Sequence, residues 1–314
     1  ERGGMGAWSH FPADPEAIRR IADGEPEPDF TVRYGHEFSV LAFHEVAYGL
    51  LNFFGAPLWL FRYRADRAYS PLHEYLAWIP RMLRFRRLSE AAERVERTAG
   101  EMSYWLAPMQ LQSDYQIRSN SPWNSLAEML DTVFASFARH APKEDRLVVK
   151  QHPHDNGIER WDLVCDRLAK RHGIDGRVDL IHGGALPRLL STCKGVVLVN
   201  STVGIHAIRA LIPTKTLGAA VYDMPGLTHQ GSLDTFWTAP EPVDPDLCSA
   251  FVRALAATIQ IRGDVYDPAG RRAAVEAVCG RVLEGRVNEP GGFVDPPPRL
   301  ARWAGRLGID ESGP

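Results

Sequence analysis

Two polar stretches of the sequence carry side chains suited to binding a negatively charged ligand. In the first, Asn200, Ser201 and Thr202 directly follow an apolar run at residues 196–199, and apolar side chains recur at helical spacing over residues 203–211. This order predicts a strand, a tight turn and a helix, with hydroxyl groups and free backbone N–H groups at the turn. Such a turn attracts anions. The same three polar residues could equally do no more than cap the helix.

The second stretch places a histidine beside a proline. His152 and Pro153 follow the apolar residues 147–149, and Pro153 restricts His152 to extended conformations, which directs the imidazole away from the end of the strand. An imidazole placed there can donate a hydrogen bond to a phosphate or stabilise a leaving anion. Lys150 and His154 make the loop basic, which favours an anionic ligand. A solvent-exposed loop histidine is the alternative.

Two aspartates are candidates for a catalytic carboxylate. Asp114 lies among glutamines after another apolar run, where it could act as a nucleophile or general base. It could also cap the next helix. Asp223 is the rival, but the proline and glycine at residues 225 and 226 make a turn role more natural for it.

Five short apolar runs alternate with helical stretches and must position these residues. The runs cover residues 104–111, 146–150, 178–181, 196–199 and 216–221. The helices are expected near residues 122–140, 158–172, 185–193, 203–211 and 245–261, with a further one near 269–285. This alternation predicts an α/β fold with a doubly wound parallel sheet. Because ligands bind at the carboxyl ends of the strands in such sheets, the polar residues that follow the runs should share one edge.

Composition excludes several classes of protein. The net charge of -3 gives no reason to expect nucleic-acid binding. The four cysteines are widely spaced, so neither a zinc site nor a disulfide framework is indicated, and buried thiols are expected. The glycine motifs of dinucleotide and P-loop sites, the hydrolase nucleophile elbow and the HExxH metal motif do not occur. No run of eighteen apolar residues that could span a membrane is present.

The first hundred residues have a different character. Asp14 before Pro15 predicts the start of a helix. Residues 36–63 are apolar and aromatic, which favours a core helix, with interfacial membrane contact as the alternative. Nine arginines lie among apolar side chains over residues 62–98. They form either a solvated helix face or a surface that meets anionic lipid or glycan.

Several segments together resemble a known family. These segments are residues 110–117 (LQ followed by SDYQI), 150–153 (KQHP), 197–204 (VLVNSTVG), 222–228 (YDMPGLT) and 1–9 (ERGGMGAWS). In their order and spacing they are similar to the bacterial capsule polysaccharide biosynthesis and export family, whose members include β-Kdo transferases. In that family the 1–9 segment lies in the middle of the protein. We therefore expect this sequence to be part of a longer protein that carries a further N-terminal Rossmann domain.

The resemblance implies a GT-B-like α/β fold. It implies a helical part of the N-terminal, acceptor-side domain at residues 1–99, a Rossmann-like CMP-sugar-binding domain at 100–265, and a helix with a Gly/Pro-rich tail at 266–314. The implied location is cytoplasmic, at the periphery of the inner membrane. Related CMP-sugar transferases carry an acidic pair before a glycine, a His-Pro pair and a Ser/Thr pair. This sequence has the second and third and lacks the first.

The implied activity is that of a retaining glycosyltransferase, which moves Kdo from CMP-Kdo to a phosphatidylglycerol-type lipid in the synthesis of the capsule linker. Asp114 and His152 are then the catalytic residues, and the donor is held by Lys150, His152, Pro153, Asn200, Ser201, Thr202 and Gly204. No cofactor or metal is required, since these donors can stabilise a monophosphate leaving group. The partners are the CMP-sugar, a glycolipid or phospholipid acceptor and the capsule synthesis and export machinery, with no nucleic acid. The alternatives are a sialyltransferase-like CMP-sugar transferase for another sugar and a non-catalytic capsule assembly protein.

Overall fold

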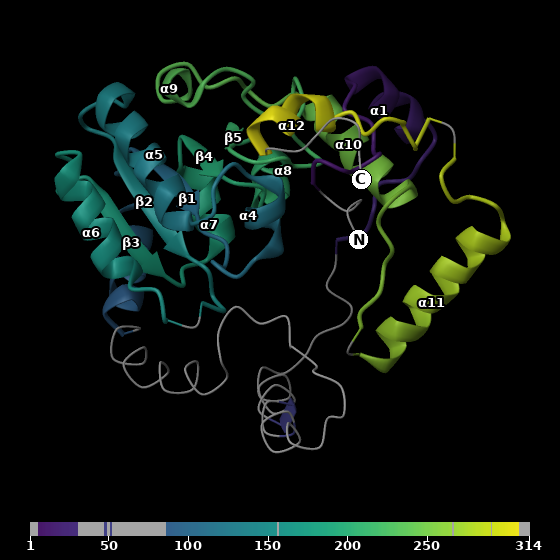
Figure 1. Ribbon diagram of the computed structural model, residues 1–314, viewed down its shortest axis with the longest axis horizontal. Helices are drawn as coiled ribbons and strands as arrows, with labels where there is room; N and C mark the ends of the chain where they lie inside the picture. Colours follow the sequence, from purple (N-terminus) through teal and green to yellow (C-terminus); the bar gives the residue numbers. More distant parts are fainter. Residues whose placement is uncertain are drawn as a thin grey trace.

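A sheet of five parallel strands forms the centre of the molecule (Figure 1). The computed structural model describes residues 6–30, 47, 48, 51, 86–155, 157–265, 267–289 and 291–307. The strands are β1 (Tyr104–Pro108), β2 (Arg146–Gln151), β3 (Val178–His182), β4 (Gly195–Leu198) and β5 (Thr214–Thr216). Their order in the sheet is β3-β2-β1-β4-β5. The chain therefore reverses its direction of travel across the sheet between β1 and β4, where a ligand crevice is expected in such sheets.

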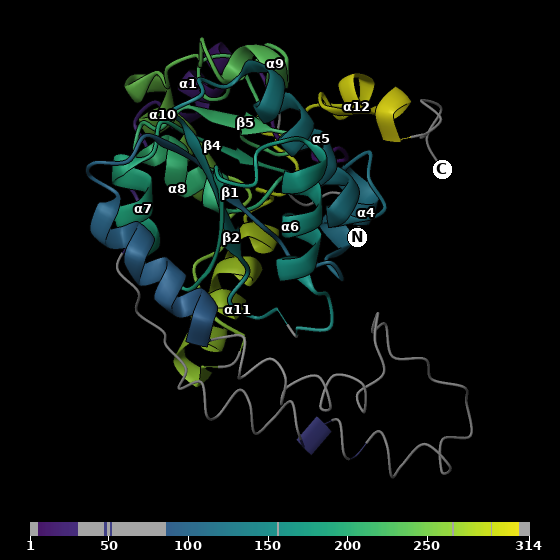
Figure 2. The same cartoon turned by 90° about the vertical axis from the view of Figure 1, so that its left-hand side faces the viewer.

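Helices cover both faces of the sheet (Figure 2). The helix bounds are α1 (Pro15–Ala22), α4 (Tyr115–Asn120), α5 (Leu126–His140), α6 (Trp161–Arg171), α7 (Leu186–Thr192), α8 (Val203–Arg209), α9 (Leu233–Phe236), α10 (Pro245–Ala257), α11 (Pro268–Leu283) and α12 (Leu300–Leu307). A further helical stretch covers residues 86–98. Helices α5 and α6 lie on one side of the strands, and α7, α8 and α10 lie on the other. This arrangement confirms the predicted α/β fold with a doubly wound parallel sheet.

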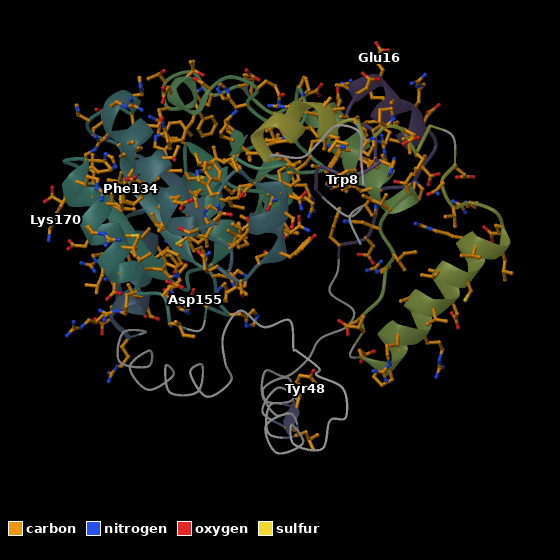
Figure 3. All side chains as sticks on the ribbon, viewed as in Figure 1. Trp8, Glu16, Tyr48, Phe134, Asp155 and Lys170 are labelled. Atoms are coloured by element: carbon orange, nitrogen blue, oxygen red, sulfur yellow. The ribbon has the colours of Figure 1, made fainter. Side chains whose placement is uncertain are left out.

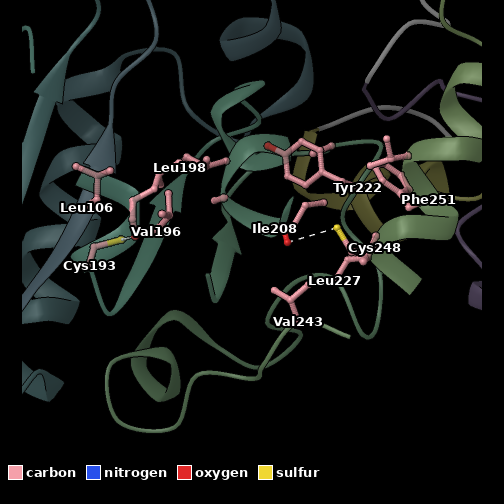
Figure 4. Close-up of a cluster of buried hydrophobic side chains, with 14 of the residues drawn as sticks. Leu106, Cys193, Val196, Leu198, Ile208, Tyr222, Leu227, Val243, Cys248 and Phe251 are labelled. Atoms are coloured by element: carbon pink, nitrogen blue, oxygen red, sulfur yellow. Dashed lines mark hydrogen bonds between the residues drawn. The ribbon is translucent and has the colours of Figure 1, made fainter. Parts of the chain in front are cut away.

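Alternate strand residues supply two separate hydrophobic cores. Leu106, Val148 and Val196 pack with α7, α8 and α10 in one cluster, part of which Figure 4 shows. Their neighbours Trp105 and Leu147 pack with α5 and α6 in the other. Since successive side chains of a strand point to opposite faces, strands buried on both sides must be apolar throughout. This is why the first four strands were recognisable as apolar runs.

One buried carboxylate links the segments at the starts of β1 and β4, at the amino-terminal edge of the sheet. Asp145 is fully buried and accepts hydrogen bonds from Ser103 Oγ at 2.6 Å, Trp105 Nε1 at 2.8 Å and Lys194 Nζ at 2.7 Å. Burial raises the pKa of Asp145, but the bonds from Lys194, Ser103 and Trp105 outweigh burial and lower it overall. The partners lie beside the starts of β1 and β4, so this group fixes the framework at the edge opposite the polar loops.

The fifth strand is not where the sequence predicted it. Residues 216–221 were expected to form it, but β5 covers Thr214–Thr216, and residues 217–221 form a buried loop. The strand is polar, so its pattern did not mark it. Lys215 is buried because its ammonium donates to the backbone carbonyls of His229 and Gly231. The first predicted strand also ends at Pro108 instead of residue 111.

Most of the predicted helices are present in the structure. Helices α5, α6, α7, α8, α10 and α11 lie within the expected regions, and Asp14 caps α1 by accepting a hydrogen bond from the backbone N–H of Ala17 at 2.9 Å. Helices α4, α9 and α12 were not predicted. Three cysteines are buried as expected, but Cys279 on α11 is exposed. The prediction of buried thiols is wrong there because α11 buries only Gly270.

The two ends of the described chain meet beside β5. Val294 N–H donates to His10 O at 2.9 Å, and the rings of His10 and Phe293 stack at 4.1 Å. Arg299 is 2% exposed and donates to the carbonyls of Phe11, Pro12, Ala220 and Val221. Burial lowers the pKa of Arg299 to about 10. These contacts pack the N-terminal segment against the loop that follows β5.

The proposed domain division at residues 99 and 265 stays a prediction. Helix α1 packs on α10, and Ile18 and Val95 share a core cluster with the sheet. Most of the apolar stretch 36–63, and the arginines up to residue 84, lie outside the described residues. In the helical stretch 86–98, exposed Glu90 and Glu93 stand among the arginines, as on an ordinary solvated face.

Candidate functional site

The loops after β1 and β4 are joined by a pair of carboxamides. Gln110 Nε2 donates to Asn200 Oδ1 at 3.0 Å, and Gln110 Oε1 accepts from the backbone N–H of Asn200 at 3.3 Å. Both side chains are at least nine-tenths buried. The pair links the two loops at the point where the strand order reverses. The polar residues after these strands therefore share one edge, as predicted.

Asp114 caps α4 at this edge. Its Oδ1 accepts from the backbone N–H of Gln116 at 2.9 Å, and its Oδ2 accepts from Gln110 Nε2 at 3.1 Å. The capping alternative is thus realised in the structure. The carboxylate is partly exposed, and each oxygen accepts one described bond, which leaves a lone pair on each for a further partner.

The turn after β4 presents unengaged donors. Within the described chain, the hydroxyl of Thr202 and the backbone N–H groups of Ser201 and Thr202 have no hydrogen-bond acceptor. Ser201 Oγ accepts from the N–H of Val203 at 3.2 Å and keeps its own O–H available. The predicted combination of strand, turn and helix with free donors is confirmed.

The buried side chain of Tyr222 holds this turn in place through a hydrogen bond. Its hydroxyl donates to Ser201 O at 2.5 Å, and burial raises the pKa of Tyr222 well above its ordinary value. Gly204 lies against the tyrosine ring, so closely that a Cβ atom there would stand 2.3 Å from the hydroxyl oxygen. Glycine is therefore required at residue 204 for packing, and its predicted part in holding the donor stays a prediction.

The loop after β2 holds His152 in a defined state. Nδ1 of His152 accepts from the backbone N–H of His154 at 3.1 Å, so Nε2 carries the proton of the neutral ring. Burial and the neighbouring His154 lower the pKa of His152. The half-buried ring is a neutral hydrogen-bond donor at pH 7.

Asp155 organises that loop. Its carboxylate accepts from Gln151 Nε2 and the backbone N–H of Gly157, both at 2.8 Å, and from Trp161 Nε1 at 3.0 Å. Figure 3 labels Asp155 at this position. Pro153 is exposed on the same loop. Asp155 was not singled out from the sequence, although an aspartate two residues after a His-Pro pair is a signal that could have been used.

Lys150 lies in the same region on β2. It is 9% exposed, and burial lowers the pKa of its ammonium. Its charge also lowers the pKa of His152, whereas the charge of Asp114 raises it. The structure thus brings Lys150, His152 and Asp114 within electrostatic reach of one another, at the edge that carries Ser201 and Thr202.

The rival carboxylate Asp223 has a different setting. It is 4% exposed, accepts from Thr228 Oγ1 at 2.9 Å and lies 3.2 Å from an Arg302 nitrogen. These partners fit the turn role that the sequence favoured for Asp223.

A further amide extends the site toward the N-terminal segment. Asn120 Oδ1 accepts from the N–H of Ala7 at 2.9 Å, and Asn120 Nδ2 donates to Gln116 Oε1 at 2.8 Å. Gln116 O in turn accepts from Asn200 Nδ2 at 3.3 Å. Sequence reasoning missed this chain of contacts, since nothing in the spacing of Ala7 and Asn120 indicates that they meet.

The described residues contain no group of three or more His, Cys, Asp or Glu side chains arranged to hold a metal ion. No helix among them has the length and apolar character needed to cross a membrane.

In α/β proteins with a doubly wound parallel sheet, ligands bind beyond the carboxyl ends of the strands at the switch point, which is where these polar residues lie. The particular family is shown by sequence. Residues 1–266 match the model of the family described as capsule polysaccharide biosynthesis protein, and the chain belongs to that family.

Relatives found by sequence agree with this assignment. The chain is 33% identical over 276 residues to the capsule polysaccharide export protein KpsS of Escherichia coli, covering 85% of this chain and 68% of KpsS. It is 35% identical over 180 residues to the capsule polysaccharide modification protein LipB of Neisseria meningitidis serogroup A, covering 57% of this chain and 42% of LipB. Among solved structures, the β-Kdo 2,7 transferase KpsC of Thermosulfurimonas dismutans is 18% identical, with a TM-score of 0.36, over 69% of this chain and 64% of that one.

Proposed function

We propose that this chain is the nucleotide-binding part of a GT-B glycosyltransferase that transfers Kdo from CMP-Kdo, with retention, to a lipid acceptor of the phosphatidylglycerol type. The observation that carries the proposal is the edge at which β1, β2 and β4 end, in a member of the capsule polysaccharide biosynthesis family. That edge offers donors at Ser201 and Thr202 for which the described residues supply no acceptor, and a neutral imidazole N–H at His152.

Each group has a definite task in this reaction. Ser201 and Thr202 hold the phosphate of the donor through their hydroxyls and backbone N–H groups. His152 donates Nε2–H to the phosphate oxygens and offsets the charge that develops as CMP leaves. A monophosphate leaving group stabilised in this way needs no metal ion.

Retention by two displacements requires a carboxylate at the anomeric carbon. In the first displacement an oxygen of Asp114 bonds to that carbon as the bond to the phosphate oxygen breaks. In the second displacement the acceptor oxygen bonds to that carbon as the bond to Asp114 breaks, and the acceptor hydroxyl releases its proton to water. Asp114 is our candidate because its oxygens keep free lone pairs and its charge reaches His152.

Two parts of the proposal concern the rest of the protein. The chain spans 68% of KpsS and less than half of LipB, so the acidic motif of related transferases would come from an N-terminal domain beyond this sequence.

Association with the inner membrane from the cytoplasmic side would rest on the basic region at residues 62–98. Binding to vesicles that depends on anionic lipid and weakens with salt would support that region; equal binding to neutral vesicles would leave only a solvated face.

The test uses the full-length protein with CMP-Kdo and a lipid acceptor. Asp114→Asn preserves the helix cap, since asparagine also accepts from a backbone N–H, but removes the nucleophile. We expect this variant to lose transfer while keeping its CMP affinity, and His152→Ala to lose both. Substantial transfer by Asp114→Asn would show that Asp114 is structural. If the unaltered protein does not bind CMP in calorimetry, the chain is neither a Kdo transferase nor a transferase for another CMP-sugar. The alternative of a non-catalytic capsule assembly protein is then favoured.

A further inference from the structure

Lys150 is a buried cation that the described part of the chain leaves without a partner. Only 9% of the residue is exposed, and no hydrogen bond or salt bridge within the described ranges reaches its ammonium. Burying an unpaired charge costs free energy, which folded proteins usually avoid by pairing the charge. A cation kept in this state at a ligand-binding edge is suited to a counter-charge supplied by the ligand.

The neighbouring carboxylates do not fill this role. Glu96 raises the pKa of Lys150 from a distance but forms no salt bridge with it, and its carboxylate accepts the backbone N–H of Ala185. The carboxylate of Asp114 accepts from Gln110 and from the N–H of Gln116.

The position of Lys150 in the sheet shows where its charge would act. Lys150 pairs with Pro108 in the parallel register of β2 and β1, and β1 separates it from β4. It shares a face of the sheet with Val148, which packs in the same cluster as Ile208 of α8. Neighbouring strands lie about 4.8 Å apart, so the Lys150 backbone is displaced by about 10 Å from the end of β4. The flexible four-carbon side chain of Lys150 is long enough to span much of this separation toward a ligand bound at Ser201 and Thr202.

We propose that Lys150 binds a second negative charge of the donor, the carboxylate of its sugar, next to the phosphate held by Ser201 and Thr202. The proposal rests on the proposed function, since it assumes a CMP-sugar at this edge. In a sugar acid such as Kdo, the carboxylate is attached to the same carbon that bears the phosphate ester, so the two charges lie side by side. Lys150 thereby selects a sugar acid over a neutral sugar, which would leave the ammonium buried and unpaired.

A binding cycle tests this role. Calorimetry compares the unaltered protein with Lys150→Met for CMP, CDP, a non-hydrolysable CMP-Kdo analogue, and the same analogue with its carboxylate reduced to an alcohol. Lys143→Met, which changes an exposed lysine on the loop before β2, is the matched control. We expect Lys150→Met to bind CMP within about twofold of the unaltered protein, but to bind the carboxylate analogue about 10- to 100-fold more weakly. The reduced analogue should bind equally to both proteins.

Other results overturn the inference in distinguishable ways. An equal loss for CMP and for the analogue would place Lys150 on the phosphate. A preference for CDP that depends on Lys150 would indicate a second phosphate instead of a carboxylate. A thermal midpoint lowered by several degrees in Lys150→Met, with every affinity unchanged, would make Lys150 structural. Absence of CMP binding by the unaltered protein would reject the proposed function itself, and the inference with it.

Discussion

Two hydrogen bonds join Gln110 and Asn200 across the boundary between β1 and β4: Gln110 Nε2 donates to Asn200 Oδ1 at 3.0 Å, and the backbone N–H of Asn200 donates to Gln110 Oε1 at 3.3 Å. The two residues lie 90 positions apart in the sequence. These bonds connect the loop that holds Asp114 to the turn that holds Ser201. Two of the three loops that carry candidate site residues are therefore linked by buried polar contacts.

We expect Gln110→Ala and Asn200→Ala each to lower the free energy of unfolding by about 1–3 kcal/mol, because each breaks the buried hydrogen bond between the two carboxamides. The double variant should lose less than the sum of the two, since that bond can be broken only once. Urea unfolding measures all three values. Gln260→Ala, at an exposed glutamine, is the control. Additive losses would mean that the two amides act independently.

Replacing Ser201 and Thr202 together by alanine should weaken CMP binding by about 1–3 kcal/mol, since hydrogen bonds to a charged group are lost. The backbone N–H groups remain, so binding should not vanish. Calorimetry with CMP measures the effect, and Ser191→Ala, at an exposed serine on α7, controls for a general loss of hydroxyls. Unchanged affinity in the double variant would remove the phosphate site from this turn.

His152 should titrate below its ordinary pKa of about 6.5, because burial and His154 disfavour the charged ring. An unfolded chain binds the proton more readily, so this group reduces stability as the pH falls from about 6.5 through the folded pKa. Bound CMP places an anion beside the ring and should raise the pKa. NMR titration with and without CMP, using His152→Ala to assign the signal, tests both statements. A midpoint at or above 6.5 in the free protein, or a midpoint that CMP does not move, would contradict them.

Asp145 should be the most sensitive carboxylate of the amino edge. Asp145→Asn weakens three hydrogen bonds and leaves Lys194 without its counter-ion, so we expect a loss of about 2–4 kcal/mol in the free energy of unfolding. Because the folded pKa of Asp145 is lowered, its contribution is complete above the unfolded pKa of about 3.9 and is lost as the pH falls through the folded value. Acid unfolding of the two proteins should therefore converge at low pH. Equal stability at pH 7 would show that this carboxylate is dispensable.

Much of the framework could be predicted from the sequence, because its signals are local. The first four strands are apolar runs, and Asn200, Ser201 and Thr202 directly follow one of them. Strand order and the handedness of crossover connections then bring the loops after β1, β2 and β4 to one edge. Lys150, His152 and Ser201 were therefore recognisable as candidates from type and spacing alone.

Only the tertiary structure decided how these groups are used. Strand β5 is polar and is buried because Lys215 finds two carbonyls in a loop that follows it. Asp114 caps α4 and also accepts from Gln110, and Asn120 reaches Ala7 across more than a hundred residues. Partners distant in sequence determine which buried polar groups are satisfied, and no local pattern records those partners. For the same reason the unpaired charge of Lys150, which distinguishes this lysine from Lys194 and Lys215, became visible only in the folded chain.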